Sequence, residues 1–397
     1  MFELNGKYGT AKIFTDNCEV EAQTQIVNLL NQPFAKDSNA RFMPDVHAGK
    51  GCTVGTTMKI VDRACPNLVG VDIGCGVEVY KFKADEIDFA KLDEMLQANT
   101  KVPYGFSKRN TAHRFANDAR LKELKCFDTI DYNGAMLSLG SLGGGNHFIE
   151  INVDEEGYNY LVVHSGSRHL GIEICKYYQD IAEKNENNID INVVIENLKK
   201  AGRQSEIQNE IKRIKEEYPI IPKDLRCVMG TDLEDYLHDM KIATEYASLS
   251  RQAIADEIIS YMNWDILEHF CSIHNYIDVE NKIIRKGAIS AQKGERVIIP
   301  ISMKDGSIIG IGKGNTDWNC SAPHGAGRVL SRSAAKATLT VEEFEKSMEG
   351  IYTSCVGRST LDESPMAYKP LEEIKAAIAD TVDIERIIKP IYNFKAN

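Results

Sequence analysis

Residues 70–76 read Gly70-Val71-Asp72-Ile73-Gly74-Cys75-Gly76 and place a carboxylate and a thiol three residues apart. Glycine permits backbone turns that other residues resist, so Asp72 and Cys75 can point into one cavity. A thiolate beside a carboxylate requires positive charge nearby, because otherwise one of the two groups stays protonated. A divalent metal ion supplies that charge and deprotonates the thiol. This stretch therefore predicts a metal centre around which the rest of the chain is organised.

The composition limits the classes of protein to consider. The chain has 397 residues, 43% of them hydrophobic, and a formal net charge of −11. Proteins that coat long duplex nucleic acid are usually basic, so any nucleic-acid contact must be local. The N-terminus has no basic-then-apolar signal pattern, and no apolar run reaches the ~20 residues of a membrane span. Ten cysteines without a secretory signal indicate reduced thiols. We therefore expect a cytoplasmic protein with no membrane segment.

Hydrophobic periodicity predicts several elements. Apolar residues at helical spacing predict an early helix over residues 19–32 and a long helix over residues 231–259. Alternation predicts a strand over residues 76–84, and a helix follows over residues 85–98. Hydrophobicity falls in residues 172–217, where two charged segments predict a protruding helical hairpin without chemistry of its own.

Two histidine motifs add candidate metal ligands. A glycine run at residues 143–145 precedes Asn146, His147 and Glu150 at the start of a predicted strand. Strand periodicity places His147 on one face and Asn146 and Glu150 on the other, so one face can serve a metal and the other a ligand. An apolar strand then ends at His164, which we predict to be a ligand, whereas we expect His169 to be structural or exposed.

Two further motifs suggest a nucleophile. Asp45 and His47 follow Pro44 in a segment rich in glycine, which predicts a rigid loop, and a simple Asp–His pair in a turn is the alternative. His324 stands between Pro323 and a Gly-Ala-Gly-Arg sequence, and this unencumbered setting suits covalent phosphoryl or nucleotidyl chemistry. On this motif alone, a histidine in a plain turn is an equal alternative.

Basic residues add two candidate phosphate contacts. Arg328 can hold phosphate oxygens with two parallel hydrogen bonds. A second group of basic side chains can either meet phosphates or form a solvated surface, and consists of Lys101, Lys108, Arg109, His113 and Arg114.

Five motifs together resemble the RtcB family of RNA-splicing ligases. They are GVDIGCG at 70–76, GGGNHFIEI at 143–151, VVHSGSR at 162–168, His-Asn at 274–275 and HGAGRVLSR at 324–332. The resemblance runs in order from about Met43 to Lys395. It implies one α+β domain over residues 1–397, with mixed β-sheets around a central metal cleft and a helical insertion near residues 172–217.

The resemblance also implies an activity. It implies a GTP- and manganese-dependent ligase that joins 2′,3′-cyclic phosphate or 3′-phosphate RNA ends to 5′-hydroxyl ends, in RNA repair or tRNA splicing. The implied partners are RNA, GTP and two Mn²⁺ ions, and accessory proteins can be further partners. The implied oligomeric state is a monomer. A thiolate with imidazoles and one carboxylate suits manganese, zinc, iron or cobalt better than magnesium.

The same resemblance assigns roles to residues. Cys75 bridges both metals, Asp72 and His147 complete the ligands of one, and His164 and His274 complete those of the other. His324 resembles the histidine that becomes guanylylated, and Asp45 resembles the carboxylate that orients its ring. The matched nucleotide contacts are Asn146, His147, Glu150, His274, Asn275, Pro300, Ser302, Met303, Ser307, His324, Gly325, Ala326, Gly327 and Lys395.

Two other functions compete with ligation. A metal-dependent phosphoesterase would open cyclic phosphates without sealing, and it would need the metal ligands but not His324. A non-catalytic RNA-binding relative would leave a complete ligand set unused, which is unfavourable because buried ionisable groups cost stability. A variant that lacks the His324 imidazole separates the ligase from the phosphoesterase.

Overall fold

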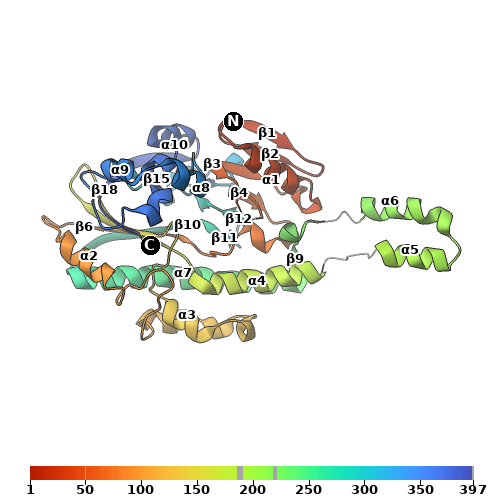
Figure 1. Cartoon of the computed structure of the whole chain (residues 1–397), viewed down its shortest axis with the longest axis horizontal. Helices are drawn as coiled ribbons and strands as arrows, with labels where there is room; N and C mark the ends of the chain where they lie inside the picture. The colour runs from red at the N-terminus through yellow and green to blue at the C-terminus, as the bar shows by residue number, and fades with distance from the viewer. Residues whose placement is uncertain (50, 186–190, 218–220, 396–397) are drawn as a thin grey trace.

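Two mixed β-sheets, with helices packed around them, form the body of the protein (Figure 1). The computed structural model describes residues 1–49, 51–185, 191–217 and 221–395. Both sheets contain antiparallel pairs and one parallel pair, which is β2–β3 in the first sheet and β17–β18 in the second. The predicted α+β class with mixed sheets is confirmed.

The first sheet has six strands in the order β1-β2-β3-β4-β12-β11. Their bounds are Phe2–Asn5 (β1), Thr10–Ile13 (β2), Arg41–His47 (β3), Val54–Lys59 (β4), Ile283–Lys286 (β12) and Asn275–Asp278 (β11). The sheet register of β3 against β4 is irregular between Phe42 and His47. Asp45 and His47 therefore lie on a distorted strand, and the prediction of a loop at this place is wrong. The irregular segment is anchored at both ends, because β3 pairs with β4 at Phe42 and again at His47.

The second sheet has the order β10-β6-β8-β7-β18-β15-β14, and β17 also pairs with β18. Its strands are Ile266–Ile273 (β10), Gly76–Phe82 (β6), Asn159–Ser165 (β8), Phe148–Val153 (β7), Val382–Lys395 (β18), Gly306–Gly312 (β15), Arg296–Ser302 (β14) and Tyr352–Thr353 (β17). The 14-residue strand β18 pairs with β15 through its first half and with β7 through its second half. The last described residue, Lys395, therefore lies inside the body.

Two short ribbons complete the strands. They are β13 (Ala288–Ser290) with β16 (Ser321–Pro323), and β5 (Arg63–Ala64) with β9 (Val228–Met229). The ribbon of β13 and β16 precedes His324, so it fixes the approach of the chain to that residue.

The longest helix, α7 (Gly230–Met262), packs against α4, β6 and β8. Its buried residues recur every three or four positions, as in Tyr236, Met240, Ala243 and Ala247, which explains why this segment is a helix. The other α-helices are Val20–Leu30 (α1), Phe89–Gln97 (α2), Tyr132–Ser138 (α3), Arg168–Asn185 (α4), Ile191–Lys200 (α5), Ile207–Glu217 (α6), Arg332–Thr338 (α8), Val341–Ser347 (α9) and Leu371–Ala377 (α10). The helices expected at residues 19–32, 85–98 and 231–259 and the strand expected at 76–84 are all present.

The helical protrusion consists of α5 and α6, which stand away from the body in Figure 1. Residues 172–185 belong instead to α4, which packs on the body through Ile174, Tyr178 and Ala182. Residues 186–190 of the predicted hairpin lie outside the described residues. Among the described helices, none is long and apolar enough to cross a membrane.

Candidate active site

The predicted metal ligands lie at neighbouring ends of three adjacent strands. Cys75 immediately precedes β6, His147 immediately precedes β7, and His164 lies near the end of β8. The register pairs Gly76 with Ser165 and Phe148 with His164, so these three strand ends meet at one edge of the sheet. Residues distant along the chain are therefore brought together by the order β6-β8-β7.

The ligand atoms of this group converge. The Cys75 Sγ lies 3.5 Å from Nε2 of His147 and 3.3 Å from Nε2 of His164. One donor atom from each of these residues lies within 4.8 Å of the other two, and all three side chains are buried. Oδ2 of Asp72 lies 3.0 Å from Nε2 of His147, which places a carboxylate at the same point.

Backbone carbonyls fix the imidazole rings. Nδ1 of His147 donates to the Leu142 carbonyl at 2.8 Å, and Nδ1 of His164 donates to the Asn146 carbonyl at 3.2 Å. These bonds place the protons on Nδ1 and leave both Nε2 lone pairs facing Cys75. Such carbonyl partners are typical of metal-ligating histidines.

Burial sets the protonation of this group. Burial, followed by the charge of Asp72, raises the pKa of the Cys75 thiol well above its usual range. Burial lowers the pKa of His164, so its ring is neutral. Burial alone would raise the pKa of Asp72, but the hydrogen bond and charge of His147 bring it down to about 2. A carboxylate, two imidazoles and a thiol that needs a cation to ionise are a donor set that fits a transition metal.

A glycine makes room for the carboxylate. A Cβ atom at Gly166, which follows β8, would collide with the Asp72 carboxyl group. The glycine in the Ser-Gly-Ser sequence after His164 is therefore required by the position of Asp72, which supports the fit of these residues to a metal ion.

His274 connects this group to the candidate nucleophile. The ring centroid of His274 lies 5.2 Å from that of His164 and 4.8 Å from that of His324. Its Nδ1 is buried and has no hydrogen-bond partner within the described part of the chain. Burial, followed by the charges of His324 and His164, lowers the pKa of His274 well below its usual range. A neutral imidazole with an unpartnered nitrogen at this place is suited to an additional ligand role.

Asp45 orients His324. Oδ2 of Asp45 lies 2.7 Å from Nδ1 of His324 and also accepts from the His324 backbone N–H at 3.1 Å. Asp45 is fully buried, whereas the His324 side chain is 18% exposed. The Nδ1 proton is thus held by the carboxylate, and the lone pair of Nε2 is left for a reaction.

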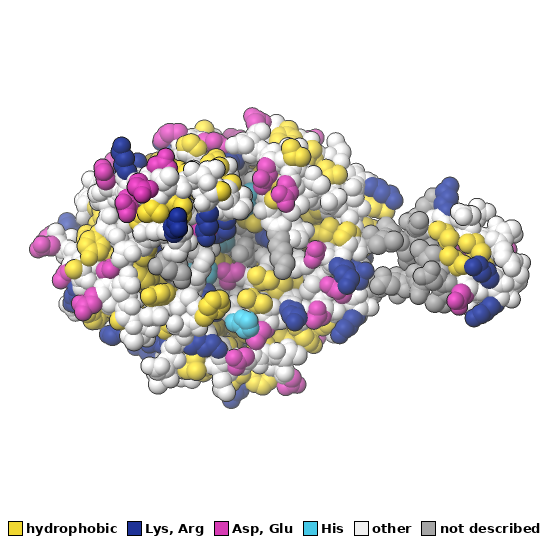
Figure 2. Space-filling view, in the orientation of Figure 1, with side chains coloured by type: hydrophobic (Ala, Val, Ile, Leu, Met, Phe, Trp, Pro, Cys, Tyr) yellow, Lys and Arg dark blue, Asp and Glu magenta, His cyan; other side chains and the backbone are white. Residues whose placement is uncertain are grey.

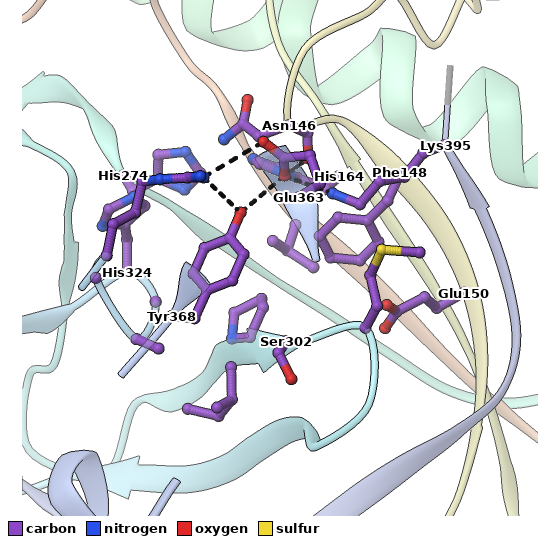
Figure 3. A pocket seen from close by; sticks show the side chains of 18 of the residues that line it. Asn146, Phe148, Glu150, His164, His274, Ser302, His324, Glu363, Tyr368 and Lys395 are labelled. Atoms are coloured by element: carbon purple, nitrogen blue, oxygen red, sulfur yellow. Dashed lines mark hydrogen bonds and ion pairs between the residues drawn. The ribbon is translucent and has the colours of Figure 1, made fainter. Parts of the chain in front are cut away.

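The histidines open into one cavity with about 820 Å³ of empty space, including its solvent-open part (Figure 3). Figure 2 shows histidines inside a hollow on this face, with Lys and Arg side chains on one rim. The predicted nucleotide contacts that line the cavity are Asn146, Glu150, His274, Pro300, Ser302, Met303, His324, Gly325, Ala326, Gly327 and Lys395.

Three predicted contacts do not line the cavity. His147 points to the metal side, as the strand periodicity of residues 146–150 predicts. The Asn275 amide accepts from the Gly287 N–H at 2.9 Å and donates to the Asp72 backbone carbonyl at 3.3 Å. It therefore links the segment that carries Asp72 to the segment that carries Gly287. Ser307 is fully buried on β15 beside Pro300.

One end of the cavity holds a cluster in which Glu363 and Tyr368 were not indicated by the sequence. Glu363 accepts from Lys395 at 2.8 Å, from the Tyr368 hydroxyl at 2.7 Å and from Arg332 at 2.6 Å, and Figure 3 shows it between Lys395 and Tyr368. Burial alone would raise the pKa of Glu363, but Lys395 and Arg332 bring it down to about 2. Arg328 donates to the Tyr368 hydroxyl at 3.1 Å, so it belongs to the same cluster.

A second buried carboxyl group lies in the wall. Glu150 accepts from Asn393 at 2.7 Å and from Asn152 at 3.3 Å. Burial raises the pKa of Glu150 to about 7. The cavity thus contains a carboxyl group that changes charge near neutral pH, beside the ammonium group of Lys395.

Other basic residues already have acidic partners. Arg109 binds Glu257 at 2.5 Å, Arg114 binds Asp256 at 2.5 Å, and Lys108 lies 3.4 Å from Asp131. The Arg114 and Lys108 side chains are nevertheless 68% and 43% exposed, so both alternatives for this basic group stay open. As expected, the His169 side chain is exposed, at 68%.

Comparison with known proteins identifies similar chains. A family model described as tRNA-splicing ligase RtcB matches residues 25–131 and 123–396. The chain is 33% identical to RNA-splicing ligase RtcB1 of Escherichia coli (strain ATCC 25922) and 32% identical to RNA-splicing ligase RtcB of Escherichia coli (strain K12), over 92% of both chains in each case. It is 27% identical to tRNA-splicing ligase RtcB of Aeropyrum pernix, over 87% of this chain and 85% of that protein.

Proposed function

The chain belongs to the RtcB family of tRNA-splicing ligases, and on that premise we propose that it is a GTP-dependent RNA ligase. It would join 2′,3′-cyclic phosphate or 3′-phosphate RNA ends to 5′-hydroxyl ends, in RNA repair or tRNA splicing. The observation that supports this proposal most directly is the 2.7 Å contact between His324 and Asp45, in the wall of a cavity that His164 and His274 also line.

The first step is transfer of guanylate to the protein. The Nε2 lone pair of His324 attacks the α-phosphorus of GTP, the bond to the bridging oxygen breaks, and pyrophosphate leaves. Asp45 holds the proton on Nδ1, so the ring becomes positively charged beside a buried carboxylate that stabilises it. The phosphoramidate formed on His324 stores the activated guanylate.

Two further displacements seal the RNA. An oxygen of the RNA 3′-phosphate attacks the guanylate phosphorus, and the bond to His324 breaks. The 5′-hydroxyl of the second RNA end then attacks the activated 3′-phosphorus, loses its proton to solvent and displaces GMP. A cyclic phosphate is first opened by water to a 3′-phosphate.

Two manganese ions would be held by Cys75, His147 and His164, with Asp72 and His274 beside them. The ions would neutralise triphosphate charge and stabilise the transition state at phosphorus. The soft and borderline donors support this choice of metal class. At the other end of the cavity, the Glu150 carboxylate would accept N–H donors of guanine while Lys395 donates.

The proposal includes the state of the protein in the cell. We propose a cytoplasmic monomer with one ligase domain over residues 1–397, in which residues 191–217 are an insertion. Accessory proteins can be further partners. All ten cysteines are free thiols, which supports a reducing compartment.

The test is a labelling assay. The purified chain, loaded with manganese, is incubated with GTP labelled at the α-phosphate, and an acid-labile label on the protein is expected. His324→Ala should abolish the label, and the matched control His169→Ala should keep it. An unlabelled wild-type protein with a full metal content would exclude the ligase. A His324→Ala variant that still opened a 2′,3′-cyclic phosphate would show a separate phosphodiesterase activity.

A further inference from the structure

Three large apolar side chains are exposed on segments that are joined to the metal donors by the chain or by backbone hydrogen bonds. The exposed fractions are 45% for Val71, 105% for Phe106 and 41% for Ile172. Val71 precedes Asp72 directly, and Ile172 lies in the first turns of α4, which begins four residues after His164. Single exposed apolar side chains are common on protein surfaces, whereas several gathered near a site can mark a binding surface.

Packing around the start of α4 brings these segments together. A Cβ atom at Gly171 would lie 2.7 Å from the Val71 carbonyl, so the first turn of α4 rests directly on the Val71 segment. A Cβ atom at Gly143 would collide with the guanidinium group of Arg168, the first residue of α4. The glycine run and the Val71 segment therefore meet on either side of the same helical turn.

Phe106 is fixed to that glycine run. The Gly105 N–H donates to the Gly143 carbonyl at 2.9 Å, and Tyr104 forms a β-bridge with Gly143. The turn is closed by the Ser107 N–H, which donates to the Tyr104 carbonyl at 3.1 Å. The exposed ring is thus held on an ordered turn that is joined to the loop leading to His147.

The surface around Gly144 and Gly145 is open enough for an extended ligand such as a strand of RNA. Within the described part of the chain, no atom lies within 4 Å of a Cβ built at Gly144 or at Gly145. Figure 2 shows hydrophobic side chains along the lower rim of the hollow, opposite the rim that carries Lys and Arg. An extended ligand can therefore pass over the glycines toward the metal donors.

The charges nearby disfavour a surface that binds mainly phosphates. The chain has a net charge of −11, and Lys108, Arg109 and Arg114 are engaged by carboxylates. Each base of a single strand has an apolar face that stacks on an aromatic ring, without any need for positive charge. The bases are therefore the part of RNA that this surface fits.

We propose that Val71, Phe106 and Ile172 form a platform for unpaired bases next to the RNA break, with a base stacked on Phe106. The platform holds the strand while its phosphate end reaches the metal donors. This inference rests on the proposed ligase function, because it assigns a place to the substrate of that reaction.

The test measures RNA binding without the reaction. A short single-stranded RNA with a 3′-phosphate and 2-aminopurine near its end is titrated with the manganese-loaded protein in the absence of GTP. Stacking on Phe106 is expected to quench the fluorescence. Phe106→Ala should raise Kd about tenfold, the effect of losing one stacked base, and should remove the quenching. Phe106→Trp should restore both.

A matched control and a salt series complete the design. Leu267 is also a large apolar residue with an exposed side chain (59%), but it lies at the end of β10 that is away from His274. Leu267→Ala should therefore leave Kd unchanged. The slope of log Kd against log salt concentration should be the same in the wild type and in Phe106→Ala, since no phosphate contact is lost. Thermal unfolding of each variant verifies that it is folded.

The outcomes are distinct from those of the ligase proposal. If Phe106→Ala binds RNA as the wild type does, or if Leu267→Ala weakens binding equally, the platform is excluded whether or not the wild type becomes guanylylated. A platform that binds an accessory protein instead would give the first of these results. A wild-type protein that is not guanylylated would contradict the ligase proposal. The quenching of 2-aminopurine would still test the platform in that case.

Discussion

Oδ2 of Asp45 accepts two hydrogen bonds from one residue, at 2.7 Å from Nδ1 and at 3.1 Å from the backbone N–H of His324. The other carboxylate oxygen, Oδ1, is buried and unpartnered among the residues that the structure describes. The aspartate therefore serves His324 almost exclusively, fixing both the ring and the chain that bears it.

Asp45→Asn should slow guanylylation of His324 by about 10²–10⁴-fold, because a neutral amide does not stabilise the positively charged ring that forms. The rate is measured in a single turnover with labelled GTP. The metal content should remain that of the wild type, since Asp45 does not contact the metal donors. An unchanged rate would reduce Asp45 to a structural residue.

Gly166→Ala should displace the Asp72 carboxyl group, because the added Cβ occupies its place. The expected result is weaker metal binding, by about 10–100-fold, with little change in the temperature of unfolding, since only the end of one side chain must move. Metal content after dialysis against a graded chelator gives the affinity. Gly357→Ala is the matched control, because no described atom lies within 4 Å of a Cβ there; equal metal binding in both variants would contradict the prediction.

Arg251 should be a positioning residue for the metal donors. It is fully buried on α7 and donates to the carbonyls of Gly74 at 2.7 Å and Ser165 at 3.0 Å, which adjoin Cys75 and His164. Its Nε lies 3.4 Å from Oε1 of Glu78, which is also fully buried. Arg251→Met should lower metal affinity about 10–100-fold and the free energy of unfolding by up to about 3–5 kcal/mol, since the buried Glu78 carboxylate loses its arginine partner and keeps only Ser248 and His269.

The double variant Arg251→Met/Glu78→Gln separates these two effects. It also removes the buried Glu78 charge, so most of the lost stability should return. The carbonyls of Gly74 and Ser165 still lack the arginine donor, so metal affinity should stay low. Calorimetric metal titration and urea unfolding measure the two quantities. If metal affinity recovers together with stability, Arg251 acts only through the fold.

Glu150 should make the nucleotide-free protein less stable as pH rises toward neutrality. Its pKa is about 7 in the folded protein, against 4.5 for the ordinary group. Between these values the folded state keeps a proton that the unfolded state has lost, so the free energy of unfolding falls as pH rises, by about 3 kcal/mol in total. Glu150→Gln should lack this term, so the difference between the two urea-unfolding free energies should change between pH 4.5 and 7.5. Parallel curves would exclude an ionisation of Glu150 in this range.

The metal side of the site could be predicted because its residues lie next to glycines in short motifs. Asp72, Cys75, His147 and His164 each stand at a strand end or in a turn, where local sequence decides the backbone. The alternation of Asn146, His147 and Glu150 between two faces also follows from strand geometry alone. Three of the predicted ligands converge as a group, and Asp72 contacts one of them.

The other end of the cavity could not be predicted from local patterns. Glu363 and Tyr368 lie in or beside short 3₁₀ segments, and nothing near them in the sequence distinguishes them from surface residues. Their role depends on Lys395, which reaches them only because β18 pairs with both β7 and β15. The strand that carries Asp45 was missed because Pro44 and the nearby glycines are typical of loops, whereas pairing with β4 at Phe42 and His47 keeps the segment between them in the sheet.

The central place of β18 has a consequence for synthesis of the protein. Because β18 lies between β7 and β15, both of those strands keep an unpaired edge until residues 382–395 have left the ribosome. Exposed strand edges pair readily with other chains, so the nascent polypeptide passes through a period in which it is prone to aggregate. The event that ends this period also delivers Lys395 to the cavity, so the strand edges are covered and the cavity wall is completed at the same time.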